Sequence, residues 1–235
     1  VAARTHDYGK QPVDHLAKLL RSESIEAAQL VLPKAFSEIN SYDEVTPRLV
    51  EQIRRNFEEE NVKIQILGCY MDLANPDDDV RKNAVDTFKK CLKFNQILGA
   101  AIVGTETAYP RLSRAEKKIW HPYMMDSIAR LAEEAERLYV DMAIEPVYWH
   151  PLEDLETTVK VFEKVDSSHL KMIFDPANVL LSLQISDFGR MKKTNDGKIV
   201  ERLDQVFITS VLLAAFKAST FLSRCASANG PFFNE

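Results

Sequence analysis

Residues 140–175 read VDMAIEPVYWHPLEDLETTVKVFEKVDSSHLKMIFD, and this stretch decides the fold that the sequence predicts. It contains two short apolar runs, Val140–Ile144 and Leu170–Phe174, each of the length and composition of a buried strand. Each run ends directly in a carboxylate, Glu145 after the first and Asp175 after the second. The stretch therefore predicts two strands with an acidic residue just past each end.

The segment between these runs predicts one amphipathic helix that begins in an acidic turn, as helix N-termini often do. Its repeating apolar positions are Leu155, Val159 and Phe162. In a parallel sheet or barrel the carboxyl ends of all strands lie at the same rim. We therefore expect Glu145 and Asp175 to lie side by side there. Two convergent carboxylates on a rigid rim indicate a divalent-metal site, an acid/base site, or both.

The same strand and helix alternation runs along the rest of the chain. Predicted strands begin near residues 2, 27, 62, 100, 140 and 170. Spacings of about 25 to 40 residues, each holding one helix, are what repeated right-handed βα units require. Because no antiparallel hairpin signal interrupts them, these units favour a closed (β/α) barrel over an open sheet. The predicted class is α/β, with one domain spanning residues 1–235.

Three of the connecting segments carry local signals. A helix is expected from Pro12 through Leu20, and another around Met124–Leu138 after an irregular segment that contains Trp120-His121-Pro122. The acidic triplet at residues 77–79 stands where a helix that stops near Gly99 begins, so capping explains it better than metal binding does.

The overall composition is that of a globular protein, with 46% apolar and 28% charged residues. A net charge of −5 gives no electrostatic reason to expect a nucleic acid or an anionic membrane as partner. No apolar run approaches the roughly 20 residues that cross a bilayer, and no signal-peptide pattern is seen. Cys69, Cys91 and Cys225 form no C-x-x-C pair, which suits free thiols in the cytoplasm. A homo-oligomer is compatible with all of this.

Further polar residues follow the predicted strands and would gather at the same rim, as in a small-molecule site. The candidates for substrate binding are His6, Lys34, Glu106, Trp149, His150 and Asn178. Each has an alternative role: Glu106 could order a loop, His6 could be a structural imidazole, and Trp149 could pack in its loop instead of forming a wall for a sugar ring. Lys34 or Arg4 could bind a phosphate or form an ion pair, since no phosphate-binding glycine loop is present.

Several short motifs in the sequence resemble those of a known family. RTHDYGK at residues 4–10, LGCY at 67–70 with NPDDD at 75–79, VGTET at 103–107, IEPVYWHP at 144–151 and MIFDPANVL at 172–180 occur in the order typical of the xylose isomerase-like TIM-barrel superfamily. This superfamily contains sugar and sugar-phosphate isomerases and epimerases. The resemblance covers roughly residues 1–181 and implies a (β/α)8 TIM barrel.

The resemblance also implies a metal site. In this superfamily one divalent cation is held by Glu, Asp, His and Glu from the last four strands, and by position Glu145 and Asp175 match the first two ligands. The first Glu also serves as an acid/base group, so Glu145 is the implied catalytic residue. Oxygen ligands with one imidazole suit Mg²⁺ or Mn²⁺, with Zn²⁺ as the alternative.

The last quarter of the chain departs from the pattern. No histidine follows His169; Gln184 falls where the third ligand would lie, and Ser227 is near the position of the fourth. Only eight residues separate Asp175 from Gln184, although a parallel crossover needs about a dozen or more. The barrel is therefore either incomplete or interrupted by a gap, which we expect between Val179 and Phe188.

The favoured function is a metal-dependent isomerase or epimerase of a small sugar, sugar phosphate or polyol derivative. A carboxylate would move a proton beside a carbonyl while the cation stabilises the enediolate. One alternative is a metallohydrolase like the abasic-site endonucleases, which the scattered histidines and acidic charge argue against. The other is a non-catalytic sugar-binding barrel, if Gln184 and Ser227 replace metal ligands.

Overall fold

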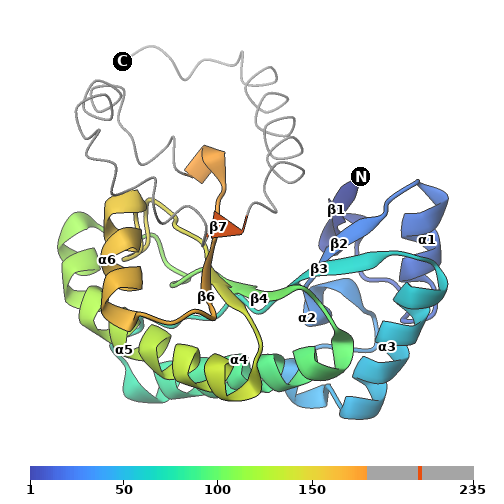
Figure 1. The fold of residues 1–235 in the computed structure, drawn as a ribbon, viewed down its shortest axis with the longest axis horizontal. Coiled ribbons are helices and arrows are strands. Elements are labelled where there is room, and N and C mark those ends of the chain that lie inside the picture. Colours follow the sequence, from blue (N-terminus) through green and yellow to red (C-terminus); the bar gives the residue numbers. More distant parts are fainter. Residues whose placement is uncertain (179–205, 208–235) are drawn as a thin grey trace, which may run out of the picture.

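A computed structural model of the protein describes residues 1–178 and 206–207. Its described strands form one parallel sheet in which neighbours in space are neighbours in sequence, from β1 to β7 (Figure 1). The strands are β1 Ala2–Arg4, β2 Ala27–Leu30, β3 Lys63–Gly68, β4 Ile102–Thr105, β5 Met142–Ile144, β6 Leu170–Ile173 and β7 Val206–Phe207. This order, with a helical connection between successive strands from β1 to β6, is that of a TIM barrel, as predicted.

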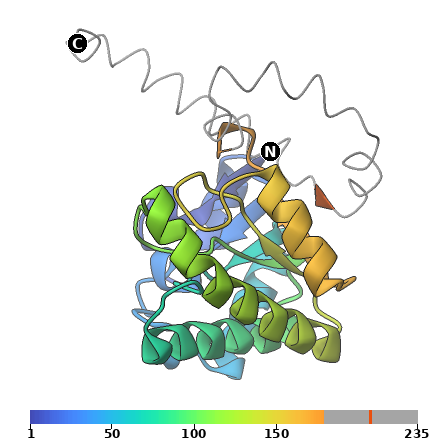
Figure 2. The same ribbon diagram turned by 90° about the vertical axis from the view of Figure 1, so that its left-hand side faces the viewer.

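The helices lie on the outer side of the curved sheet, and α3, α4 and α5 run along its convex face in Figure 1. Figure 2 shows α4, α5 and α6 packed beside one another as a layer outside the strands. The helices are α1 Leu16–Ser22, α2 Leu32–Ala35, α3 Pro47–Glu59, α4 Asp78–Leu98, α5 Arg114–Leu138 and α6 Leu155–Val165, with 3-10 turns η1 Thr5–Tyr8 and η2 Tyr42–Glu44. None of the helices in the described ranges combines the length and the apolar character that a bilayer span would need.

The acidic triplet at residues 77–79 caps the start of α4, as the sequence indicates, and Asp77 is the cap residue. Oδ1 of Asp77 accepts hydrogen bonds from the backbone N–H groups of Asp79 and Val80, at 2.9 and 3.1 Å. These donors have no partner within the helix, so the side chain satisfies them. At the other end Gly99 adopts the left-handed conformation, with φ of 71°, and closes the helix.

Helix α5 is longer than predicted, because the segment expected to be irregular is its first half. Ser113 and Glu116 form a reciprocal capping box that starts the helix, and Pro122 lies inside it with its side chain exposed. The expectation of an irregular segment around Pro122 is therefore wrong. Helix α1 differs in the other direction and begins at Leu16 instead of Pro12.

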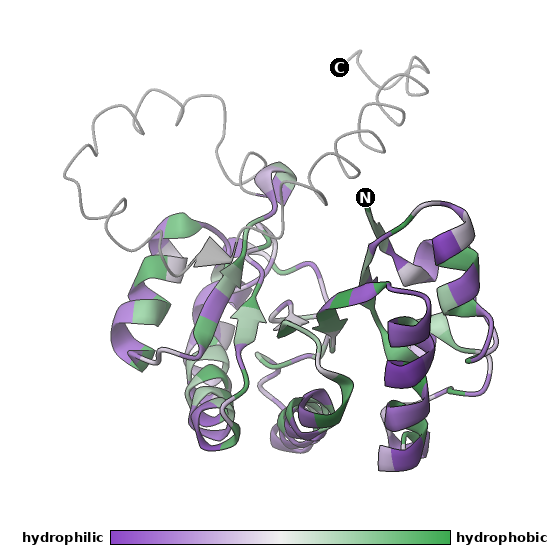
Figure 3. Cartoon of the chain, turned by 45° about the vertical axis from the view of Figure 1, so that its right-hand side comes forward, coloured by the Kyte–Doolittle hydropathy of each residue, from purple (hydrophilic) through white to green (hydrophobic). Residues whose placement is uncertain are grey.

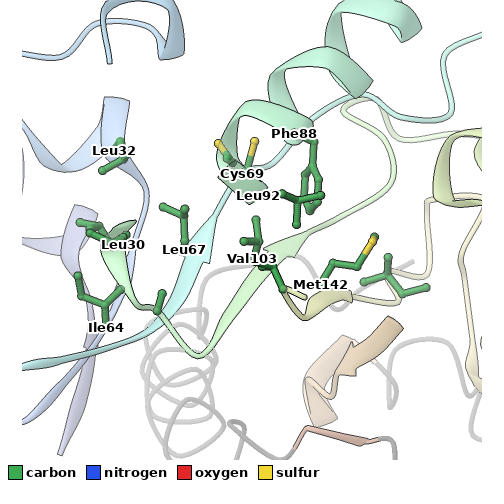
Figure 4. Packing of buried hydrophobic residues seen from close by; sticks show 14 of the residues in the cluster. Leu30, Leu32, Ile64, Leu67, Cys69, Phe88, Leu92, Val103 and Met142 are labelled. Atoms are coloured by element: carbon green, nitrogen blue, oxygen red, sulfur yellow. The ribbon is translucent and has the colours of Figure 1, made fainter. Parts of the chain in front are cut away.

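Alternation along the strands divides the apolar side chains into two clusters. The larger cluster lies between the sheet and the helices, where Leu67, Val103 and Met142 meet Phe88 and Leu92 of α4 (Figure 4). Figure 3 shows hydrophobic and hydrophilic residues mixed along the helices, as expected when one face of each helix packs on the sheet. The smaller cluster lies inside the barrel and consists of Ile66, Ile102, Ala143 and Ile173.

Gly104 of β4 is required by the packing inside the barrel. A Cβ at this position would lie 2.7 Å from Cδ1 of Ile173 and 2.9 Å from Cγ2 of Ile66. Both distances are too short for carbon atoms, so a larger residue would push the inner cluster apart.

The strand next to β6 corrects the prediction for the C-terminal quarter. It is β7, with Met172 opposite Val206 and Ile173 opposite Phe207, both in parallel register. The segment at residues 184–188, which resembles the end of the family's seventh strand, lies outside the described residues, and the strand that pairs with β6 comes later in the chain. The chain between β6 and β7 exceeds the dozen or so residues that a parallel crossover needs, which removes the objection based on length. Gln184, Ser227 and the expected gap after Val179 lie outside the described residues.

Candidate active site

The inner face of the barrel continues from apolar to acidic toward the carboxyl ends of the strands. Glu145, just past β5, is two positions after Ala143 of the inner cluster; Asp175, just past β6, is likewise two positions after Ile173. Because side chains alternate along a strand, this step of two keeps each carboxylate on the inner face. Glu106 follows on β4 by the same rule. The carboxyl rim of three successive strands therefore presents acidic groups to the interior.

Glu145 and Asp175 are both buried, with 3% and 6% of their surface exposed. The backbone N–H of Glu145 donates to the carbonyl of Thr105 at 2.9 Å, which attaches the residue to the end of β4. Its Oε1 accepts a hydrogen bond from Nδ2 of Asn178 at 2.8 Å, and Oδ1 of Asp175 accepts one from the backbone N–H of Ala177 at 2.9 Å. The segment after β6 thus orients both carboxylates.

Tyr70, two positions past β3, is near enough to these acidic groups for their charges to act on its phenol. Burial raises the pKa of its phenol well above 10, and the negative charges of Glu145, Glu106 and Asp175 raise this pKa further. The positive charge of Arg4 offsets part of this rise in the pKa of Tyr70. The phenol therefore stays protonated and accepts a hydrogen bond from the side-chain amide of Gln29.

A cavity of about 610 Å³ opens at this rim. Four of the predicted site residues line it: His6, Lys34, Glu106 and Glu145. Asn178 does not line it but reaches it through its hydrogen bond to Glu145. A cavity of this volume has room for a small carbohydrate.

Trp149 and His150 do not line this cavity, although both belong to the loop that follows β5. The Trp149 ring packs against the guanidinium of Arg111, whose Cζ lies 4.5 Å from the ring centroid. His150 is fully buried behind Glu106, and its Nδ1 lies 3.9 Å from Oε2 of that residue. Burial, with a contribution from the nearby ammonium of Lys117, lowers the pKa of His150 to about 4, so the imidazole is neutral.

The cavity residues that sequence reasoning missed include Gln29, Tyr42 and Tyr109. The Tyr42 hydroxyl donates to the carbonyl of Gly68 at 2.8 Å, and the Tyr109 hydroxyl donates to the carbonyl of Tyr70 at 2.9 Å. Both tyrosines come from connecting segments without a motif. Only Gln29 carried a signal, as a polar residue inside an otherwise apolar strand.

Comparison with protein families places this site in context. The profile of the family described as "Xylose isomerase-like TIM barrel" matches residues 17–207 of the chain. The chain belongs to this family. A search of the curated protein sequences finds no match.

Solved structures of the xylose isomerase-like TIM barrels support the fold. D-psicose 3-epimerase with D-tagatose from Clostridium cellulolyticum H10 is 16% identical, with a TM-score of 0.59 over 73% of this chain and 62% of its own. A family protein from Mycobacterium smegmatis in complex with magnesium is 16% identical, with a TM-score of 0.58 over 76% and 65%. The IOLI protein with a zinc atom is 13% identical, with a TM-score of 0.65 over 88% and 70%. The chain thus spans less than two thirds of the length of the first two.

The residues at the rim fit part of a site for a hard cation. Glu145 and Asp175 offer carboxylate oxygens after successive strands, as hard cations prefer. The charges of both residues also act on the phenol of Tyr70. Within residues 1–178 and 206–207, no group of three or more His, Cys, Asp or Glu residues is arranged to hold a metal ion. The two carboxylates could supply only part of the ligand set of such a site, and a complete site needs further donors.

Proposed function

We propose that the chain is a metal-dependent isomerase or epimerase that acts on a small sugar, sugar phosphate or polyol derivative. The observation that carries this proposal is the buried carboxylate of Glu145, which lines the cavity and is held by Asn178 at one oxygen. The similar structures include a sugar epimerase and proteins with bound magnesium or zinc, which agrees with this proposal.

In this proposal Glu145 is the acid/base group. Its carboxylate takes the proton from the carbon beside the substrate carbonyl and returns it to that carbon or to its neighbour. A cation held by Glu145 and Asp175 would supply Lewis-acid chemistry, polarising the substrate oxygen as negative charge develops. The hydrogen bond from Asn178 fixes the orientation of Glu145, which keeps the reacting groups within reach of each other.

Two neighbours would bind the substrate. Glu106 lines the cavity with 35% of its side chain exposed, so its carboxylate is placed to accept hydrogen bonds from sugar hydroxyls. Tyr70 stays protonated and can donate from its hydroxyl to a sugar oxygen.

Proton transfer in heavy water tests this function. The protein is incubated in D₂O with Mn²⁺ or Mg²⁺ and a panel of ketoses, ketose phosphates and polyols, and NMR follows deuterium uptake at carbon together with the new epimer or isomer. The proposal expects uptake with at least one member of the panel, and its loss in a Glu145→Gln variant that keeps the circular dichroism of the wild type. Undiminished turnover in that variant would rule out Glu145 as the acid/base group.

A further inference from the structure

The charged side chains that line the cavity are sorted by side. Those from the ends of β1 and β2 are basic or imidazole groups, and those from the ends of β4 and β5 are carboxylates. The first set is Arg4, His6 and Lys34, and the second is Glu106 and Glu145; Asp43 of η2, which is paired with Lys90, is the acidic lining residue outside the second set. Tyr70 lines the same cavity, and its ring lies 6.0 Å from the Lys34 ammonium. A bound molecule would meet a cationic wall and an anionic wall.

Lys34 is fixed at the rim by its backbone. It belongs to α2, which follows β2 directly, and its N–H donates to the carbonyl of Val31 at 2.9 Å. Its helix neighbours Leu32 and Ala35 are fully buried, so α2 cannot rotate and carry the lysine away from the rim. The ammonium lies 6.0 Å from the centroid of the Tyr70 ring. A charged residue at the carboxyl end of a barrel strand is in the place where such barrels bind ligands.

The other charged groups on this wall are matched by partners. Arg4 makes a two-point ion pair with Asp7, with Nε to Oδ2 and Nη2 to Oδ1 both at 3.1 Å. Asp43, the acidic group contributed by η2, pairs with Lys90. In contrast, no carboxylate within the described part of the chain lies within 4.0 Å of the Lys34 ammonium. Its charge is therefore available to a ligand.

We propose that the substrate of this cavity is a sugar phosphate whose phosphate group binds to Lys34, at the end of the sugar away from Glu145. The carbohydrate part of this inference rests on the proposed isomerase or epimerase function. A lysine is a compact point charge that suits a phosphate, whereas a carboxylate is bound best by a guanidinium fork, and the fork of Arg4 is engaged by Asp7.

Charge also orients the substrate in this proposal. The carboxylates of Glu106 and Glu145 repel a phosphate, while Lys34 attracts it across the face of Tyr70. The phosphate therefore occupies the β2 side, and the carbon that reacts is left at the β5 side beside Glu145. The lysine would thus select the substrate and set its direction in the cavity at the same time.

Binding of matched sugar pairs tests the proposal. Calorimetric titrations with Mn²⁺ present compare D-fructose with D-fructose 6-phosphate and D-ribulose with D-ribulose 5-phosphate, on the wild type and on Lys34→Gln. The control is Lys18→Gln, because Lys18 is exposed on α1 and does not line the cavity. We expect at least one phosphorylated sugar to bind about tenfold or more tightly than its partner, with most of this preference lost in Lys34→Gln and kept in the control.

Other outcomes separate the two proposals. Equal affinity within every pair, or a preference that survives Lys34→Gln, overturns the phosphate site while the proposed sugar chemistry stands. Tighter binding of D-gluconate than of any sugar phosphate would mean that the Lys34 ammonium binds a carboxylate. That result also overturns the phosphate site. Failure of every sugar, phosphorylated or not, to bind the folded wild type contradicts both proposals together.

Discussion

Asn178, three residues beyond Asp175, donates a hydrogen bond from its side-chain amide to Oε1 of Glu145 over 2.8 Å. This bond joins the segment after β6 to the end of β5, so the orientation of one carboxylate depends on the strand that carries the other. A partner that orients a metal ligand affects affinity without touching the ion. The pair therefore offers a way to disturb the site while leaving both carboxylates in place.

Replacing Asn178 by Ala removes this bond, and we expect the affinity for Mn²⁺ to fall about 10- to 100-fold, as is typical when a supporting partner of a ligand is lost. Isothermal titration calorimetry measures the change. Asn56→Ala is the control, because Asn56 also donates from a side-chain amide, to the carbonyl of Val13, but does not line the cavity. Equal losses in both variants would mean that Asn178 has no special part in metal binding.

His150 makes the stability of the fold depend on pH. Its pKa is about 4 in the folded protein because the ring is buried, against 6.5 for an ordinary histidine. Between these values the unfolded chain binds a proton that the folded chain does not, so stability falls as the pH drops from 6.5 toward 4. The loss reaches roughly 3 kcal/mol at most, from about 1.4 kcal/mol per pKa unit.

Urea unfolding at pH 7, 5.5 and 4.5 measures this dependence. The difference in unfolding free energy between wild type and His150→Gln should shrink as the pH falls, since the variant lacks the titrating ring. His15→Gln is the matched control, because His15 is exposed, and its pH profile should follow the wild type. Parallel profiles for wild type and His150→Gln would contradict the assignment of a buried, neutral imidazole.

Gly104→Ala tests the packing inside the barrel. The added Cβ would meet Ile173 and Ile66, and overpacking of this kind costs about 1–3 kcal/mol. Ile173→Val removes the Cδ1 atom nearest to the new Cβ, so it should recover part of the loss in the Gly104→Ala background. In the wild-type background the same change should cost about 0.5–1.5 kcal/mol. Simple additivity of the two substitutions in a double-mutant cycle would show that the contact does not exist.

Strand positions could be predicted because each strand is a short apolar run with its own local signal. The six strand starts inferred near residues 2, 27, 62, 100, 140 and 170 agree within two residues with β1 to β6. The rule that parallel strands share a rim then placed Glu145 and Asp175 correctly past β5 and β6. These inferences needed only alternation and connection length, which the sequence contains directly.

The errors in the prediction arise where a local sequence signal is misleading or absent. The first half of α5 was missed because Pro122 is a strong local signal, whereas the capping box at Ser113 and the packing of the helix outweigh it. Tyr42 and Tyr109 were missed because their position in the cavity depends on bonds to the carbonyls of Gly68 and Tyr70, distant in sequence. Such contacts follow from the three-dimensional fold and not from any local sequence pattern.

The most direct test of the central claim is a titration of the metal-free protein with Mn²⁺, followed by calorimetry or by loss of the free-ion electron paramagnetic resonance signal. We predict one ion per chain, with affinity reduced by about 100-fold or more in Glu145→Gln and in Asp175→Asn, and unchanged in Glu156→Gln, an exposed carboxylate of α6. Circular dichroism verifies that each variant is folded. Affinity that stays at the wild-type value in both rim variants would contradict the account.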